Sequence, residues 1–461
     1  MEESDWEIIL KIKFLGATGT VTGSKYLLTI QNKHILVDCG LFQGFKELRL
    51  RNWDRLPIAP ADIDAVVLTH AHIDHTGYIP LLVKNGFKGT IYATKPTCDL
   101  CAILLPDSGY LQEEDARFAN LHGYSKHHPA LPLYTVKDAE KSLEHFKPMQ
   151  FTQEYTLAPG IQVSWHRAGH ILGASFVQFE VEGKTLLFSG DIGRFHDPIM
   201  KAPVIMHETD YLVLESTYGN RLHEKSDPKD SIAKVVVDTI QRGGTVLIPA
   251  FAVGRAQSVL YYLAQLKKEK RIPDVPIFLD SPMAIDATLL LQHYADKETH
   301  LTPEQCRMAC SVANYINTVD ESKELDEPSP KIIVSASGMM TGGRVLHHLK
   351  TIAPDPRNTI LMTGYQAGGT RGADLLAGGR EIKIHGETIA VKAQVVSLNS
   401  LSAHADYEDI LYWLKQFKHP PRKVFITHGE PEAADALKKR IEKELGWFCE
   451  IPTYLEEVTL G

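Results

Sequence analysis

Three histidines and one aspartate lie within a six-residue segment, where their side chains could bind metal. His70, His72, Asp74 and His75 follow the apolar run DAVVLT, which predicts a strand, and precede TGYIPLLVKNG, which predicts a helix. Imidazole nitrogens and carboxylate oxygens are ligands that zinc accepts at about 2.0 to 2.2 Å. Each residue alone is more often a surface histidine or a helix-capping aspartate. All four together predict a metal site, and one such segment can serve two ions.

Four further aspartates and histidines come at the ends of apolar, strand-like runs. Taken singly, an aspartate there is usually a turn residue and a lone histidine is usually structural. However, strand ends in an α/β protein meet at the crevice where ligands bind. Two metals about 3.5 to 4 Å apart need roughly three such ligands each and a bridging carboxylate. Together with the HAHIDH segment, that set is supplied by Asp38 after HILV, His170 in HRAGHILG, Asp191 in LLFSGD and His428 in VFITHGE.

The elements that must position these residues follow from the apolar pattern. Ten β-branched runs predict core strands, and helix-length segments separate several of them, which predicts an α/β architecture with helices layered on sheet. YLLTI and HILVD are separated only by residues 31–33, which predicts a hairpin and therefore a mixed first sheet. The ten runs are HILVDCG, DAVVLTH, IQVSWHRAGH, TLLFSGD, YLVLES, TVLIPAF, PIFLD, KIIVSASG, TILMTGY and KVFITHGE.

Three segments suggest how the chain is divided. Residues 98–150 are His-rich and mostly helical or irregular, which predicts an insertion or a lid. From Tyr218 to about Gly386, strands alternate with helical segments, which predicts a second, self-contained α/β domain. Inside that domain, the acidic, proline-bounded stretch at residues 320–330 is expected to be an exposed loop.

Composition and charge limit the classes of function. The chain has 461 residues, 44% of them hydrophobic and 23% charged, which is typical of globular proteins with two or three domains. The net charge of −8 excludes a protein-wide basic field, so any polyanion must be held locally. The sequence opens with acids instead of a secretory signal, and no apolar run is long enough for a bilayer, which predicts a cytoplasmic protein without a membrane partner. The cysteines imply no disulfide framework, and Cys98 and Cys101 are expected to be buried and unreactive.

The HxHxDH pattern with a downstream histidine and aspartate resembles the metallo-β-lactamase fold. Glu215 in ESTYG, His404 in SAHAD and His428 in THGE resemble the β-CASP branch of that fold. The segments AFAVGRAQ, SASGMMTGGR and GYQAGGTRG resemble its inserted domain. The resemblance runs from about Phe14 to the last strands, which is nearly the whole chain.

This resemblance implies a fold and an activity. The fold is an α/β, αββα sandwich formed by residues 1–215 and 387–461, with an α/β β-CASP cap inserted at residues 216–386. The activity is hydrolysis of phosphodiester bonds of single-stranded RNA in processing or decay, by endonuclease or 5′-exonuclease action or both. Archaeal relatives often carry amino-terminal RNA-binding modules and RNase J carries a carboxy-terminal extension, whereas this sequence shows the core alone. We therefore expect sequence choice to come from the cleft or from a partner, and a homodimer is a further expectation because relatives often pair.

The same resemblance assigns roles to the candidate metal ligands. It implies two Zn²⁺ ions, which Mn²⁺ could replace in vitro. Asp38 matches a buried aspartate that supports the ligand loops without touching metal. His428 stands where RNA-directed members carry histidine and the DNA-repair branch carries valine, which favours RNA over DNA. The first zinc would be held by His70, His72 and His170, the second by Asp74, His75 and His428, and both by Asp191.

The expected reaction is hydrolytic attack on phosphorus. A dizinc pair lowers the pKa of a bound water from 15.7 to about 7, so a metal-bridging hydroxide can act as the nucleophile. The resemblance gives catalytic roles to Asp74, Glu215 and His404. In this assignment Glu215 orients the imidazole of His404, and His404 is the candidate general acid for the leaving oxygen. The alternative for His404 is a helix-capping histidine beside Ser402.

Small-residue turns and arginines are candidates for holding the RNA backbone. Backbone N–H groups in such turns can bind phosphate, and a guanidinium group can bind it with two hydrogen bonds. Ordinary turns and solvated arginines are the alternatives. The candidates are Arg255, Ser335, Ser337, Gly338, Arg344, Thr370 and Arg371.

Two other functions fit the same residues. A hydrolase of small esters or thioesters, of the glyoxalase II kind, would keep the metal site, but the inserted domain of about 170 residues is superfluous for that task. A catalytically silent RNA-binding subunit of a processing complex would have no need for all seven ligand positions.

Overall fold

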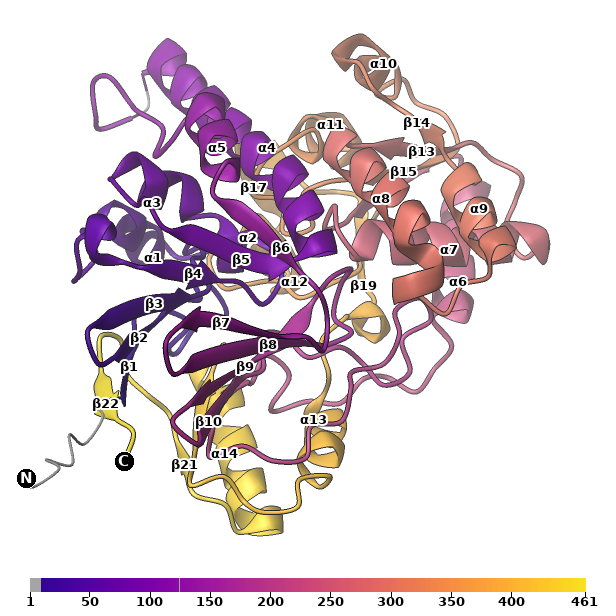
Figure 1. Ribbon diagram of the computed structural model, residues 1–461. Helices are drawn as coiled ribbons and strands as arrows, with labels where there is room; N and C mark the ends of the chain where they lie inside the picture. Colours follow the sequence, from indigo (N-terminus) through magenta and orange to yellow (C-terminus); the bar gives the residue numbers. More distant parts are fainter. Residues whose placement is uncertain (1–9, 124) are drawn as a thin grey trace, which may run out of the picture.

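The computed structural model describes residues 10–123 and 125–461, which form a two-sheet sandwich and a cap (Figure 1). Residues 1–9, on which the argument against a secretory signal rests, lie outside the described residues. Within the two described ranges, no helix has the length and hydropathy that a membrane span requires.

The first sheet of the sandwich is mixed, as the hairpin pattern predicts. Its strand order is β22-β1-β2-β3-β4-β5-β6, with antiparallel pairs up to β3 and parallel pairs from β3 to β6. Ile30 pairs with Lys33, so the hairpin loop is one residue shorter than expected. The strands are β1 (Leu10–Phe14), β2 (Tyr26–Ile30), β3 (Lys33–Val37), β4 (Ala65–Val67), β5 (Thr90–Thr94), β6 (Phe146–Met149) and β22 (Glu457–Thr459).

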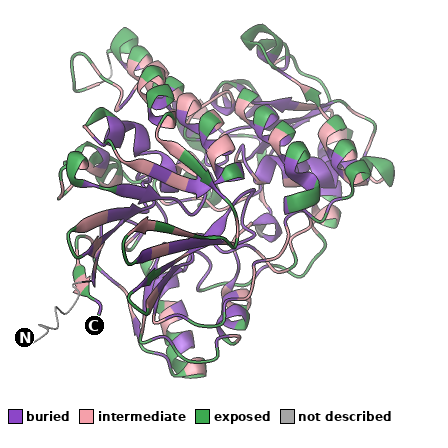
Figure 2. Cartoon of the chain, viewed as in Figure 1, coloured by how far each residue is buried: buried purple, intermediate pink, exposed green. Residues whose placement is uncertain are grey.

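The second sheet packs face to face against the first. Its strand order is β21-β20-β11-β10-β9-β8-β7. Large aromatic side chains, among them Phe14, Trp165 and Phe425, fill the space between the sheets and are fully buried. The strands of both sheets contain long buried stretches (Figure 2). The strands are β7 (Glu154–Ala158), β8 (Ile161–Arg167), β9 (Ser175–Val181), β10 (Lys184–Phe188), β11 (Tyr211–Glu215), β20 (Lys423–Thr427) and β21 (Cys449–Glu450).

Helices cover the outer faces of both sheets, which completes the expected αββα layering (Figure 1). Those on the first sheet are α2 (Ile73–Thr76), α3 (Ile79–Lys84), α4 (Lys95–His122) and α5 (Val136–Leu143). Those on the second sheet are α13 (Tyr407–Leu414) and α14 (Pro431–Leu445). The short elements that remain in the sandwich are α1 (Lys46–Leu50), η1 (Arg51–Trp53) and η2 (Pro60–Asp62), and η3 (Asn399–Leu401) lies where the chain returns from the cap.

The cap is a parallel α/β layer built on the strand order β14-β13-β15-β12-β16-β19. Parallel strands buried on both faces need near-continuous apolar runs, and β12, β15 and β16 are buried throughout. The strands are β12 (Thr245–Pro249), β13 (Ile277–Asp280), β14 (Asn314–Tyr315), β15 (Lys331–Ser335), β16 (Thr359–Met362) and β19 (Gln394–Ser397), with the hairpin β17 (Glu381–Ile384) and β18 (Glu387–Ala390). The helices are α6 (Pro228–Gln241), α7 (Arg255–Lys268), α8 (Pro282–Glu298), α9 (Pro303–Ser311), α10 (Val319–Glu324), α11 (Val345–Ile352) and α12 (Arg371–Leu376).

Three expectations about the layout need correction. The sheet of the cap continues past residue 386, because β19 pairs with β16. Residues 98–150 are not wholly an insertion, because their last part is β6, an edge strand of the first sheet, while the helical part is α4 and α5. The expected loop at 320–330 contains α10, which the hydroxyl of Thr318 caps. Cys98 and Cys101 lie on α4 as free thiols, and Cys101 is buried as expected, whereas Cys98 is only partly buried, although burial raises its pKa to about 12.

Candidate active site

The HAHIDH segment is held in place by Asp38. The segment follows β4 and enters α2, and Asp38 follows β3, the neighbouring strand. Asp38 Oδ1 accepts a hydrogen bond from the Thr69 N–H, and Oδ2 accepts one from the Thr69 hydroxyl, each at 2.8 Å. Asp38 Oδ2 also lies 2.7 Å from Nδ1 of His75. This fully buried carboxylate therefore fixes both the loop and the ring orientation of one candidate ligand.

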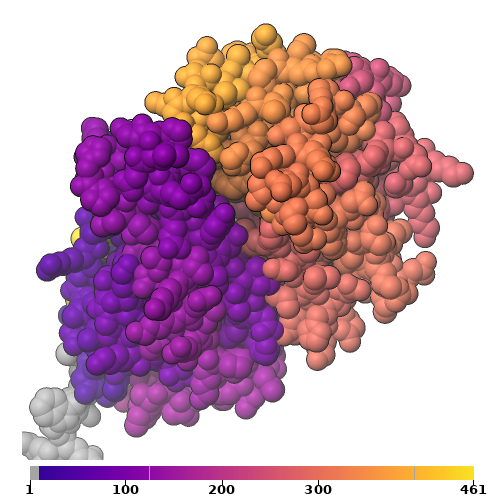
Figure 3. Space-filling model, turned by 90° about the horizontal axis from the view of Figure 1, so that it is seen from above, coloured from indigo at the N-terminus to yellow at the C-terminus, as the bar shows by residue number. Residues whose placement is uncertain are grey.

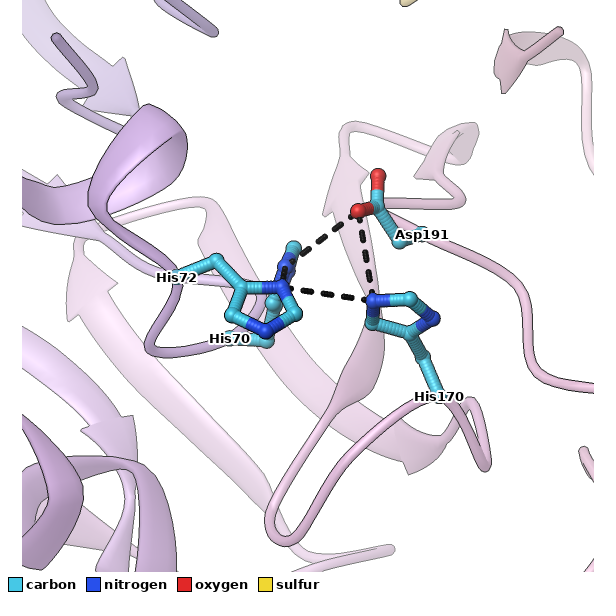
Figure 4. A group of neighbouring side chains, drawn as sticks. All are labelled: His70, His72, His170 and Asp191. Atoms are coloured by element: carbon cyan, nitrogen blue, oxygen red, sulfur yellow. Dashed lines mark hydrogen bonds and ion pairs between the residues drawn. The ribbon is translucent and has the colours of Figure 1, made fainter. Parts of the chain in front are cut away.

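Four of the candidate ligands form one group on the floor of the site (Figure 4). His72 Nδ1 lies 3.2 Å from His70 Nε2 and 3.3 Å from His170 Nε2. Asp191 Oδ2 lies 3.4 Å from Nε2 of His70 and 3.5 Å from Nε2 of His170. A tetrahedral zinc site with bonds of about 2.0 to 2.1 Å has ligand atoms roughly 3.3 Å apart. The spacing of the group therefore fits a tetrahedral metal ion.

A second group lies beside the first and shares Asp191. His75 Nε2 lies 3.1 Å from His428 Nε2, which in turn lies 3.4 Å from Asp74 Oδ2. Asp191 Oδ1, which has no hydrogen-bond partner among the described residues, lies 3.3 Å from His75 Nε2. The two oxygens of one carboxylate thus face two separate groups, which is the geometry that a bridging ligand requires.

The electrostatics of the site favour the ligating form of the first group, whereas in the second group the carboxylates of Asp191 and Asp38 outweigh burial and raise the pKa of His75 well above its ordinary value. Burial lowers the pKa of His70 to about 3 and lowers those of His72 and His170, so these imidazoles are neutral. Burial alone would raise the pKa of Asp191, but the imidazoles of His428, His75 and His70 hold it well below its usual range. Neutral imidazole and ionised carboxylate are the forms that bind a cation.

Glu215 and His404 form a pair above the candidate metal ligands. Glu215 ends β11, where its Oε1 accepts a hydrogen bond from the Ile192 N–H at 2.6 Å and its Oε2 accepts one from the Thr217 N–H at 3.2 Å. Nδ1 of His404 lies 3.2 Å from Glu215 Oε1 and 3.3 Å from Oε2. Burial opposes protonation of His404, yet the carboxylates of Glu215 and Asp191 raise its pKa above the ordinary value. The helix that follows is capped by Asp406, so His404 does not cap it.

These groups line a cavity of about 240 Å³ between the sandwich and the cap. In the space-filling view, the segment around residue 100 and the cap meet along a furrow (Figure 3). Helix α4 contributes Asp107 and Ser108 to the wall, and the cap contributes Phe251, Met339 and Tyr365. The sequence pattern does not distinguish these five side chains, because the α4 segment predicts only an insertion or a lid and apolar residues after strands resemble core residues.

The candidate phosphate-binding residues divide into two sets. Arg255 and Ser337 line the cavity. Arg255 is buried, its Nε lacks a partner among the described atoms, and burial lowers its pKa to about 10. Gly338 packs against Phe251 behind the wall.

The other four candidates make hydrogen bonds within the cap, and none of them lines the cavity. Ser335 is fully buried and its hydroxyl donates to the Asp280 carbonyl. Thr370 caps α12, and the guanidiniums of Arg344 and Arg371 donate to backbone carbonyls of the cap. Their part in the cap is to fix its loops.

Comparison with known proteins agrees with this geometry. Residues 27–216 match a metallo-β-lactamase superfamily domain, residues 256–375 a β-CASP domain, and residues 388–452 an RNA specificity domain of zinc-dependent metallo-hydrolases. Ribonuclease TTHA0252 of Thermus thermophilus is 35% identical over 437 residues, which cover 93% of this chain and 95% of that protein. The chain belongs to the β-CASP family of the metallo-β-lactamase superfamily.

Other β-CASP proteins resemble the chain over nearly its full length. Transcription termination factor FttA of Methanosarcina mazei is 33% identical over 98% of this chain and 72% of that protein. The RNase J-like protein of Methanocaldococcus jannaschii is 32% identical over 96% of this chain and 97% of that protein. The predicted fold, a metallo-β-lactamase sandwich with an inserted β-CASP cap, is confirmed, and the chain is a metallo-hydrolase by family.

Proposed function

We propose that this β-CASP protein is a dinuclear metal-dependent ribonuclease that hydrolyses phosphodiester bonds of single-stranded RNA. One observation carries the proposal: Asp191 presents one carboxylate oxygen to each of two His/Asp groups, directly below the pair Glu215 and His404. The ribonuclease name of the Thermus relative and the RNA specificity domain at residues 388–452 support RNA as the substrate.

The donor set fits two Zn²⁺ ions. The first would be held by His70, His72, His170 and Asp191, and the second by Asp74, His75, His428 and Asp191. When bound, the ions would supply a water of lowered pKa and a Lewis acid for phosphate oxygens.

The protein's own residues then bind and orient the RNA. Arg255 offers a buried guanidinium without an acidic partner within 4.0 Å in the described chain, so a phosphate can fill that role. Nδ1 of His404 is hydrogen-bonded to the Glu215 carboxylate. Nε2 of His404 is therefore the nitrogen that can donate a proton to the leaving oxygen. The apolar side chains of Phe251 and Met339 exclude bulk water from this part of the cavity.

The structure supports the two alternative functions less well than it supports a ribonuclease. A hydrolase of small thioesters has no use for a cap whose residues form one wall of the cavity. A silent RNA-binding subunit has no use for a complete donor set with an ordered Glu215–His404 pair. Thioester turnover faster than RNA cleavage would favour the first alternative, and metal-free protein that still binds RNA would favour the second.

The proposal is tested by cleavage of one labelled RNA prepared with a 5′-triphosphate, a 5′-monophosphate or a circularised backbone. Protein with two equivalents of Zn²⁺ is expected to cleave it, and His404→Ala protein with the same metal content is not. Cleavage of the circle identifies an endonuclease, while cleavage restricted to the 5′-monophosphate identifies a 5′-exonuclease. The same slow rate for both proteins on all three RNAs would refute the assignment.

A further inference from the structure

A short excursion of the first domain carries an exposed group of basic and aromatic side chains. Residues 45–55, here named the basic ledge, comprise α1, η1 and their flanking residues. Trp53 is 58% exposed, Leu50 52% and Phe45 44%, although side chains of this kind are usually buried. The cationic residues of the ledge are Lys46, Arg49, Arg51 and Arg55, against the acids Glu47 and Asp54.

The ledge is a rigid support and not a frayed loop. The Asn52 side chain is buried, its Oδ1 accepts the Phe42 N–H at 2.9 Å, and its Nδ2 donates to the Phe42 carbonyl at 2.8 Å. The Arg51 guanidinium lies 4.3 Å from the ring centre of Tyr454 and 5.5 Å from that of Phe42. These contacts fix the turn from which Trp53 projects.

The ledge begins at the wall of the cavity. Gln43 lines the cavity, and its N–H donates to the Thr22 hydroxyl at 3.2 Å. Two residues further on, the Phe45 ring packs on a glycine turn of the cap, where a Cβ added at Gly368 would meet it at 2.5 Å. Ala367, next to that turn, also lines the cavity. Residues 43–45 and 367–369 are in close contact, so the ledge lies on the outer side of this part of the cavity rim.

The charges of the ledge are available to a ligand. Its cationic side chains make no ion pair within 4.0 Å of a carboxylate in the described chain. The ledge carries an excess of two positive charges, whereas the whole chain carries −8. Burial raises the pKa of Asp115 on α4, and the guanidiniums of Arg371 and Arg49 lie near enough to act against that rise.

We propose that the basic ledge binds the single-stranded RNA segment that lies just outside the cavity. Trp53 stacks on a base, and Lys46, Arg49 and Arg55 contact the phosphates on either side. Alternation of an aromatic face with cationic groups matches the alternation of base and phosphate along a single strand. A protein partner would need a larger apolar surface than three separated side chains provide. The inference rests on the proposed function, because it extends the path of the same RNA.

The test measures binding of a fluorescein-labelled U15 oligonucleotide in the His404→Ala background, so that the RNA stays intact. Trp53→Ala is expected to weaken binding about tenfold, while Trp53→Phe, which keeps an aromatic face, retains most of the affinity. Phe448→Ala is the matched control, because Phe448 is 56% exposed beside Lys423 but lies at the β21 edge of the sandwich. The affinity of Phe448→Ala protein for U15 is expected to equal that of the His404→Ala protein without a further substitution.

Tryptophan fluorescence provides a second readout. Among the described tryptophans only Trp53 is exposed, so RNA-dependent quenching should disappear in Trp53→Ala. Equal affinity of Trp53→Ala and Phe448→Ala would overturn the proposal, as would equally tight binding of a poly-glutamate peptide to the ledge. Failure of the ribonuclease assignment is distinguishable, because it would leave the unaltered enzyme inactive on RNA while the Trp53-dependent binding persisted.

Discussion

Nδ1 of His75 lies 2.7 Å from Oδ2 of Asp38, and both side chains are almost completely buried at the floor of the candidate metal site. This contact leaves Nε2 of His75 pointing at His428 and Asp191. The orientation of one ligand of the second group therefore depends on a carboxylate that belongs to neither group.

Asp38→Asn is expected to weaken metal binding to the second group by about 10- to 100-fold. The amide cannot supply two acceptors to Thr69 and His75 at once, so the ring loses its fixed tautomer. Competitive titration with a chelator measures the effect as a biphasic release, with one ion lost earlier. Asp64→Asn, a change at a surface aspartate paired with Lys33, is the control and should leave both ions in place.

Glu215→Gln is expected to lower kcat by about 10² to 10⁴ while leaving metal content and KM nearly unchanged. The amide keeps the volume of the side chain but no longer favours the protonated form of His404. Single-turnover cleavage of RNA with a poor leaving group measures the loss. An RNA-like substrate with a leaving group that needs no proton should be cleaved at close to the normal rate, and an equal loss on both substrates would contradict the role of His404.

Arg255→Met is expected to have opposite effects on stability and on substrate binding. Removing a buried, unpaired guanidinium should raise the free energy of unfolding by roughly 1 to 3 kcal/mol. Removing a charged phosphate contact should raise KM for RNA about tenfold or more. Denaturant unfolding and initial rates measure the two effects. A more stable protein with an unchanged KM would show that Arg255 does not contact RNA.

The stability of the cap is expected to fall at alkaline pH. His348 is buried between Asp280 and Asp326, with nitrogen to oxygen distances of 2.6 and 2.9 Å, and although burial opposes it, these carboxylates raise the pKa of His348. A raised folded-state pKa contributes stability that is complete below the ordinary value of about 6.5 and is lost as pH rises through the folded value. Urea unfolding at pH 6 and pH 9 should show a larger loss for the unaltered protein than for His348→Gln, and parallel losses would contradict the assignment.

The sequence predicted the floor of the site well because strand ends constrain side chains. His70, Asp38 and Asp191 follow strands whose apolar pattern is unambiguous, and the layering of an α/β fold brings such ends together. The wall of the site was harder to predict. Whether Arg344 faces the cavity or the backbone depends on its rotamer and on Asp280, which lies 64 positions away in the chain.

Short strands at the edge of a sheet and apolar residues of the cavity wall were also difficult to predict from the sequence. β19 is four residues long and half-exposed, so its apolar pattern did not reveal that it extends the cap sheet. Phe251 and Met339 looked like core residues because packing against a ligand and packing against protein require the same apolar side chains. Only tertiary structure distinguishes these cases.

The chain passes between the two domains at two crossings, and the two residues of the proposed catalytic pair lie one near each crossing. Glu215 is the last residue of β11 before the outward crossing, and His404 lies seven residues beyond the end of β19, on the return. Both residues are nevertheless anchored to one segment of the sandwich, because Glu215 Oε1 accepts a hydrogen bond from the Ile192 N–H and His404 forms a β-bridge with Gly193. A rotation of the cap would therefore move the cap side of the cavity while the contact between Glu215 and His404 stayed in place, so substrate access could change without loss of the orientation of the proposed acid.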